Sequence, residues 1–268
     1  MNEITVILFV VGGIVLLFLL LGIRKKLRRA QCLKLQFTDA ERQELIEDFP
    51  TFGRLPESIR LELEGIMHVF MAEKSFEACG GLEEVTGHMR RVVAAEACLL
   101  LVNRRHNFYR KLRSILIYPT AYKAQNEHGG EDVRLGESWT SGSVILAWDS
   151  VVSGGRNQED GSNVSIHEFA HQLDQEDGVG DGVPVLVNGR GAYREWAGIF
   201  SKAFEKFQRK VEKGRRTVID SYGATNPAEF FAVATETFYE KPKQLREHYP
   251  DVYQQLCNYY HVDPAEWL

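Results

Sequence analysis

The stretch from Asn163 to Asp174 reads NVSIHEFAHQLD, and it decides both the fold and the chemistry predicted for this chain. On a helix, residues four positions apart lie one above the other on the same face. His167 and His171 would therefore direct two imidazole nitrogens to one point, where they can bind one metal ion. Glu168 follows the first histidine and can reach a water at that metal. This spacing is the HExxH arrangement of zinc metallopeptidases.

The residues around the two histidines suit a half-buried helix. Apolar side chains recur at helical spacing between them, and Asn163 or Ser165 can cap the first turn. Asp174 lies three residues after His171 and could accept its outer N–H, as carboxylates behind metal ligands do. The alternative is a surface helix that carries two solvated histidines and no metal.

A third protein ligand has to come from elsewhere, because catalytic zinc commonly takes three and keeps a fourth position open. The best candidate is Glu229, in the stretch that follows Asn226-Pro227. Asn226 can cap a helix there, and proline suits its first position. Glu236, seven residues on, shares the face of Glu229. Glu229 fits a capping-box acid that reaches back to Asn226 equally well, so the spacing leaves both roles open.

The first residues form an uninterrupted apolar run. Residues 4–23 read ITVILFVVGGIVLLFLLLGI, close to the roughly 20 residues of a membrane-spanning helix. Five basic residues follow within positions 24–29, and none precedes the run, the reverse of a secretory signal. The positive-inside rule then predicts a single-pass protein of the inner membrane with its catalytic domain in the cytoplasm. The alternatives are a cleaved signal or a buried core helix.

Charge and cysteine content bear on partners and compartment. The formal net charge is −5, and the part beyond the basic cluster is more acidic still, which argues against direct binding of nucleic acid. The four cysteines, Cys32, Cys79, Cys98 and Cys257, form no CxxC pair. Scattered thiols of this kind fit a reducing compartment better than a disulfide framework.

The rest of the chain reads as a mostly helical α+β protein with a small sheet. We expect residues 1–31 to form the membrane anchor and its basic flank, and residues 32–268 to form one peptidase domain. The strand at 144–148 is expected to offer an edge for an extended substrate. Trp148 and the loop 176–191 are expected to shape the pocket. Helices are predicted at 38–47, 57–70, 86–102, 193–213 and from Pro227, and strands at 115–118 and 144–148.

Two of these stretches together resemble a known family. NVSIHEFAHQLD, with YGATNPAEFFAVATE at 222–236, is similar to the Mlc titration factor A family of zinc peptidases. That family is in turn similar to the catalytic domain of anthrax toxin lethal factor. The resemblance extends to residues 76–82, 94–101, 117–119 and 144–148, and covers most of the chain from residue 35.

The resemblance implies a zincin-like fold and a role for each matching residue. His167, His171 and Glu229 match the family's ligands for one zinc ion, and Glu168 matches its general base. Tyr222 matches a tyrosine that stabilises the oxyanion in the lethal-factor group. Weak aminopeptidase-like activity on peptides is implied. Glu236 receives no role from the resemblance, and we place it behind the ligands.

The resemblance also bears on partners. Better-known members are soluble and bind a sugar-regulon repressor in the cytoplasm, whereas this chain begins with a predicted anchor. A peptide or protein substrate is therefore the first prediction. The alternative is a membrane-tethered module that sequesters a transcriptional regulator, with zinc in a structural or regulatory role. A membrane-tethered quality-control protease is a third possibility.

Overall fold

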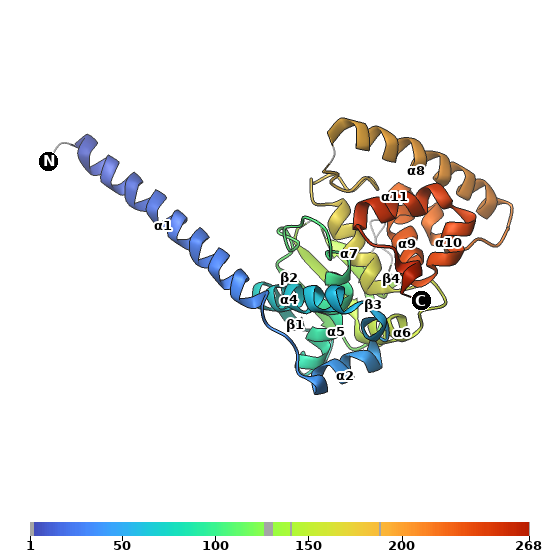
Figure 1. The fold of residues 1–268 in the computed structure, drawn as a ribbon, viewed down its shortest axis with the longest axis horizontal. Coiled ribbons are helices and arrows are strands. Elements are labelled where there is room, and N and C mark those ends of the chain that lie inside the picture. The colour runs from blue at the N-terminus through green and yellow to red at the C-terminus, as the bar shows by residue number, and fades with distance from the viewer. Residues whose placement is uncertain (1–2, 126–130, 140, 188, 268) are drawn as a thin grey trace.

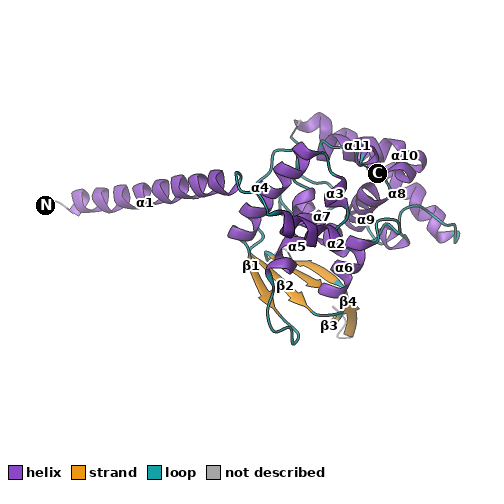
Figure 2. Cartoon of the chain, turned by 60° about the horizontal axis from the view of Figure 1, so that its bottom comes forward, coloured by secondary structure: helices purple, strands orange, loops and turns teal. Residues whose placement is uncertain are grey.

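The computed structural model describes residues 3–125, 131–139, 141–187 and 189–267. Helices dominate this part of the chain (Figure 1), and the strands lie together on one side of them (Figure 2). The α-helices are α1 (Glu3–Cys32), α2 (Asp39–Asp48), α3 (Thr51–Arg54), α4 (Glu57–Glu73), α5 (Gly87–Leu99), α6 (Trp148–Arg156), α7 (Val164–Asp174), α8 (Gly189–Glu212), α9 (Pro227–Glu240), α10 (Pro242–His248) and α11 (Pro250–Tyr260). Two short 3-10 helices are η1 (Ser221–Ala224) and η2 (Pro264–Glu266).

The strands form a four-stranded sheet and a separate hairpin. The sheet has the order β1-β2-β6-β5, in which β1, β2 and β6 are parallel and β5 runs antiparallel to β6. The hairpin pairs β3 with β4. The strands are β1 (Ser75–Ala78), β2 (Ser114–Tyr118), β3 (Tyr122–Gln125), β4 (Glu131–Arg134), β5 (Gly136–Trp139) and β6 (Ser143–Ala147).

This order corrects one prediction about substrate binding. The predicted edge strand at 144–148 is β6, which lies between β2 and β5 and has both sides paired. Its residues are almost wholly buried, as a central strand covered on both faces requires. The edge next to it is β5, a polar strand that the sequence did not predict. Trp148 is not part of the strand and begins α6 instead.

The core fixes the helix that carries the two histidines. Phe169, on α7, is fully buried, and its ring lies 5.8 Å from that of Phe70 on α4 and 5.4 Å from that of Tyr109. The first contact is edge-on and the second is tilted, and aromatic contacts of this kind add to the free energy gained from burying the rings. Because Phe169 anchors one face of α7 in the core, the opposite face turns toward α9 and β5.

Helix α1 projects away from the rest of the protein and carries the chain's N-terminal end (Figure 1). Its basic end is held by α4, where Arg29 forms a two-bond ion pair with Glu73 at 2.6 and 2.7 Å. Among the residues that the structure describes, whose side chains in α1 begin at Val11, no helix is both long and apolar enough to cross a membrane.

The predicted transmembrane helix is therefore not borne out.

Candidate metal centre

Helix α7 begins where the sequence predicts. The side chain of Asn163 accepts the backbone N–H of Ile166 at 2.9 Å and so caps the helix. The four-residue spacing then brings the imidazoles of His167 and His171 together edge to face, with ring centroids 4.7 Å apart. Their Nε2 atoms lie 3.1 Å from each other. Two ring nitrogens thus face one point at the surface of the core.

Helix α9 brings a carboxylate to the same point. Oε2 of Glu229 lies 3.1 Å from Nε2 of His167 and 3.3 Å from Nε2 of His171. Among the described residues, His167, His171 and Glu229 form a group whose ligand atoms lie close enough together to hold one metal ion. The predicted ligands are therefore brought together in space.

The spacing of the three atoms fits zinc. Bonds of about 2.0–2.1 Å in a tetrahedral site put neighbouring ligand atoms roughly 3.3 Å apart. The observed triangle, with sides of 3.1, 3.1 and 3.3 Å, is close to that value. Two imidazoles and one carboxylate are also the donor set of known catalytic zinc sites with an open fourth position.

The structure does not show Glu229 in the alternative role of a capping-box acid, whose carboxylate would accept the backbone N–H of Asn226. Its backbone N–H donates to the side chain of Asn226 at 2.9 Å, so Asn226 caps α9. The carboxylate of Glu229 is left to face the histidines. Burial would raise the pKa of Glu229, but hydrogen bonds with His167 and His171 outweigh it and lower that pKa to about 2. The side chain is thus held as an anion, as a metal ligand must be.

Glu236 supports the first histidine from behind. Its Oε1 lies 2.7 Å from Nδ1 of His167, and its Oε2 accepts the backbone N–H of Asn163 at 2.6 Å. A carboxylate on Nδ1 holds the proton there and leaves Nε2 free to bind a metal. Glu236 therefore joins the cap of α7 to the orientation of His167.

Asp174 does not have the role predicted for it. Both of its carboxylate oxygens accept the backbone N–H of Gly182 at 2.9 Å, and it does not bond to His171 in the described structure. Asp174 instead closes the loop that follows α7. The sequence could not pair Glu236 with Nδ1 of His167, because the two residues are far apart along the chain.

Glu168 is buried and lies under β5. Burial raises the pKa of Glu168 to about 7, although the two histidines act in the opposite direction. A Cβ added at Gly136, the first residue of β5, would meet Oε1 of Glu168 at 2.7 Å and Cγ2 of Val164 at 2.6 Å. Only glycine leaves room for the Glu168 side chain at this position.

A cavity of about 920 Å³ opens in front of the three ligands. Glu168, β5 and Tyr222 line it, and Tyr222 is 56% exposed with its ring centroid 6.0 Å from that of His167. Trp148 and the loop 176–191, which were predicted to shape the pocket, are absent from its described lining. Strand β5 forms part of the wall instead, because it packs against α7, the helix that carries the two histidines.

Replacing Gly136 with alanine should lower kcat without loss of metal. The new methyl group would push the Glu168 carboxyl away, and a misplacement of about 1 Å can cost on the order of 10²-fold in turnover. Steady-state kinetics and zinc content would be measured together. Gly191→Ala is the matched control, because nothing lies within 4 Å of a Cβ there. Wild-type kcat in Gly136→Ala would mean that β5 does not position Glu168.

The fold and the donor set define a class: a metallopeptidase-like domain with one candidate His-His-Glu metal site. The sequence pattern of the glucose-regulated metallo-peptidase M90 family matches residues 23–261, so the chain belongs to that family.

Individual relatives agree with this assignment. An uncharacterized protein, slr2042, from Synechocystis sp. is 39% identical over 224 residues, which are 80% of this chain and 81% of that protein. Mlc titration factor A from Klebsiella pneumoniae (strain 342) is 28% identical over 81% of this chain and 84% of its own. The same-named protein of Yersinia pestis (strain Pestoides F) is 28% identical over 82% and 84%. The predicted resemblance to the Mlc titration factor A family is confirmed.

Proposed function

We propose that the protein is a zinc-dependent peptidase in which Glu168 is the general base. The observation that supports this most directly is the triangle of His167, His171 and Glu229 with Glu168 buried beside it. A zinc ion bound there would supply a polarised water and a Lewis acid for the scissile carbonyl. Glu168 would accept the proton of the attacking water at its carboxylate and pass it to the leaving amine.

The phenol of Tyr222 is proposed to donate a hydrogen bond to the oxyanion that develops on the substrate. Tyr222 lines the same cavity as the buried Glu168 and is itself largely exposed to solvent, which supports this role. Burial raises the pKa of Tyr222, so the hydroxyl keeps its proton at neutral pH. The substrate backbone is proposed to add to the free edge of β5 as a further strand. An aminopeptidase-like preference is the specificity we propose.

A panel of peptides tests the proposed reaction. The zinc-loaded full chain would be incubated with free and N-terminally blocked peptides, and the products identified by mass spectrometry. Cleavage of free N-termini alone supports an aminopeptidase, and cleavage of blocked peptides within the chain supports an endopeptidase. Zinc bound with no cleavage of any peptide would contradict the peptidase proposal.

The contribution of Tyr222 can be measured with Tyr222→Phe. We expect kcat to fall by on the order of 10²-fold, the usual effect of losing one oxyanion donor, with zinc content unchanged. Tyr118→Phe is a suitable control because that tyrosine stacks on Tyr122 and does not line the cavity. An unchanged kcat would remove Tyr222 from the mechanism.

A second candidate function is the binding of a transcriptional regulator. It is favoured by the name of the relatives that are 28% identical, which describes titration of a protein called Mlc. A pull-down with Glu168→Gln as bait would test it. A captured regulator that is released intact, and a cellular phenotype that Glu168→Gln leaves unchanged, would favour binding over hydrolysis.

The location of the protein stays a prediction. A single-pass protein of the inner membrane would stay in the membrane pellet after carbonate extraction. Release into the supernatant would contradict that location. The absence of direct nucleic-acid binding is likewise a prediction from charge.

A further inference from the structure

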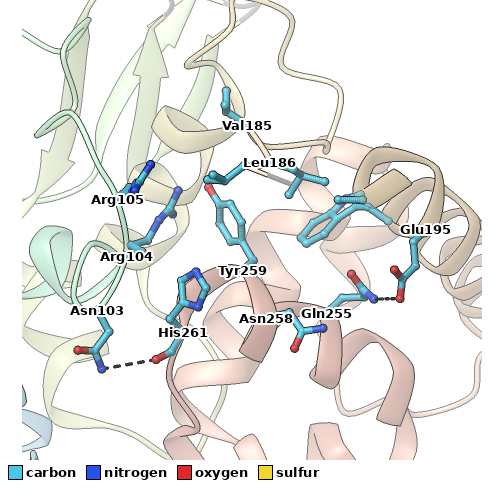
Figure 3. A pocket seen from close by; sticks show the side chains of 13 residues that line it. Asn103, Arg104, Arg105, Val185, Leu186, Glu195, Gln255, Asn258, Tyr259 and His261 are labelled. Atoms are coloured by element: carbon cyan, nitrogen blue, oxygen red, sulfur yellow. Dashed lines mark hydrogen bonds between the residues drawn. The ribbon is translucent and has the colours of Figure 1, made fainter. Parts of the chain in front are cut away.

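A second pocket lies apart from the metal centre. It has a volume of about 290 Å³, near the lower end of the range of about 300–1,000 Å³ for small-molecule sites. The loop after α5, the loop before α8, the first turns of α8 itself, and α11 form its walls (Figure 3). It shares no lining residue with the metal cavity.

One end of this pocket carries positive charge without a carboxylate partner. The guanidinium of Arg104 lies over the ring of Tyr259, with its Cζ 4.0 Å from the ring centroid. Its Nη1 is buried and makes no hydrogen bond of good geometry to a described residue, and the same is true of the Tyr259 hydroxyl, although the guanidinium and the phenol attract each other electrostatically. Arg105 lines the same end (Figure 3), and neither arginine is a member of the ion pairs found between described residues. A buried cationic donor without a partner is unfavourable unless an anion binds it.

The opposite end carries a carboxylate. Glu195 lies across the pocket from Arg104 (Figure 3), and Nε2 of Gln255 donates to its Oε1 at 2.9 Å. A carboxylate has two oxygens and several acceptor positions, so Glu195 can still bind a cation. The pocket is therefore positive at one end and negative at the other.

The wall between the two ends is apolar and rigid. Trp196 is 1% exposed and stacks on Phe200 with ring centroids 4.1 Å apart. Its indole N–H already donates to the carbonyl of Gly182 at 3.1 Å, so it offers only an apolar face. Tyr259 packs edge-on against Trp196 at 5.7 Å, and Leu186 completes the wall.

We propose that this pocket binds a small zwitterion, a free amino acid or dipeptide with an apolar side chain. Its carboxylate would pair with Arg104 and accept from the Tyr259 hydroxyl, since a guanidinium matches the planar carboxylate group. Its ammonium group lies toward Glu195, and its side chain packs against Trp196 and Leu186. The site does not depend on bound zinc or on the proposed peptidase activity.

Four probes separate the contributions of the two ends. Binding to the full chain, stripped of metal so that the metal centre cannot hold a carboxylate, would be measured by calorimetry. The probes are L-phenylalanine, 3-phenylpropanoate, phenethylamine and inorganic phosphate. We expect saturable binding of phenylalanine, with both single-charge analogues weaker by about tenfold or more, the equivalent of one charge-assisted contact. Phosphate should not bind.

Two variants make the test specific to the site. Arg104→Gln should weaken phenylalanine and 3-phenylpropanoate alike, by about tenfold or more. Glu195→Gln, an exposed and structurally mild change, should weaken phenylalanine but leave 3-phenylpropanoate unchanged. Arg215→Gln, an exposed arginine elsewhere, is the control for net charge. If Arg104→Gln does not fold, Leu186→Trp fills the pocket instead and should abolish binding.

The proposal is overturned by any of four results. These are no saturable binding of phenylalanine up to about 10 mM, equal binding of phenethylamine, phosphate as the sole ligand, or wild-type affinity in both Arg104→Gln and Leu186→Trp. A site that binds through apolar contact alone would give the second result. A simple anion site would give the third.

Discussion

Replacing Glu168 with glutamine is expected to abolish peptide hydrolysis while zinc stays bound. The amide has nearly the same shape as the carboxyl and fills the same space beneath Gly136, so the packing of α7 is kept. It cannot accept a proton, and loss of a general base typically costs on the order of 10²–10⁴-fold in rate. Single-turnover kinetics, with zinc content measured by elemental analysis on the same samples, would check this.

The pH profile gives a second readout of the same residue. Glu168 acts as a base only when ionised, and burial raises its pKa to about 7. Activity should therefore fall as the pH drops below neutrality, and a bound cation, which favours the ionised form, shifts that limb to lower pH. Glu159→Gln, an exposed loop acid, should keep both the rate and the limb. Substantial turnover in Glu168→Gln would assign the base to another group.

The local part of the site could be predicted from the sequence. The positions of His167 and His171 depend only on helical spacing, and the Asn163 cap that begins α7 is also a local signal. The same holds for the capping box of α2, in which Thr38 and Glu41 bond to each other as their spacing indicates. Interactions within one turn of a helix can thus be predicted from the sequence without knowing the fold.

The non-local part could not be predicted with the same certainty. The spacing of Glu229 fitted a cap and a ligand equally well, and only the packing of α9 on α7 separates them. Strand β5 reads Gly-Glu-Ser-Trp, which has no apolar alternation, because one of its sides pairs with β6 and the other faces the cavity. Its strand conformation comes from the sheet it joins, so the sequence alone favoured β6 as the edge.

Replacing Glu229 with alanine is expected to release zinc. The change removes one of three ligands and leaves the two imidazoles, whose Nε2 atoms lie 3.1 Å apart, without the anion that holds a cation between them. Helix α9 should remain folded, because Asn226 and Pro227 still form its first turn. We expect zinc affinity to fall by more than the roughly 10–100-fold that loss of a supporting hydrogen bond costs. Competition with a chromophoric chelator would measure it.

Glu236→Gln is the informative comparison, because both carboxylates contact His167 but from opposite sides of its ring. An amide at position 236 can still orient the ring, but it no longer favours the proton on Nδ1, so affinity should fall by only about 10–100-fold. The order of the two losses decides which carboxylate binds the metal. A larger loss in Glu236→Gln, with zinc fully retained in Glu229→Ala, would make Glu236 the ligand and return Glu229 to the helix cap.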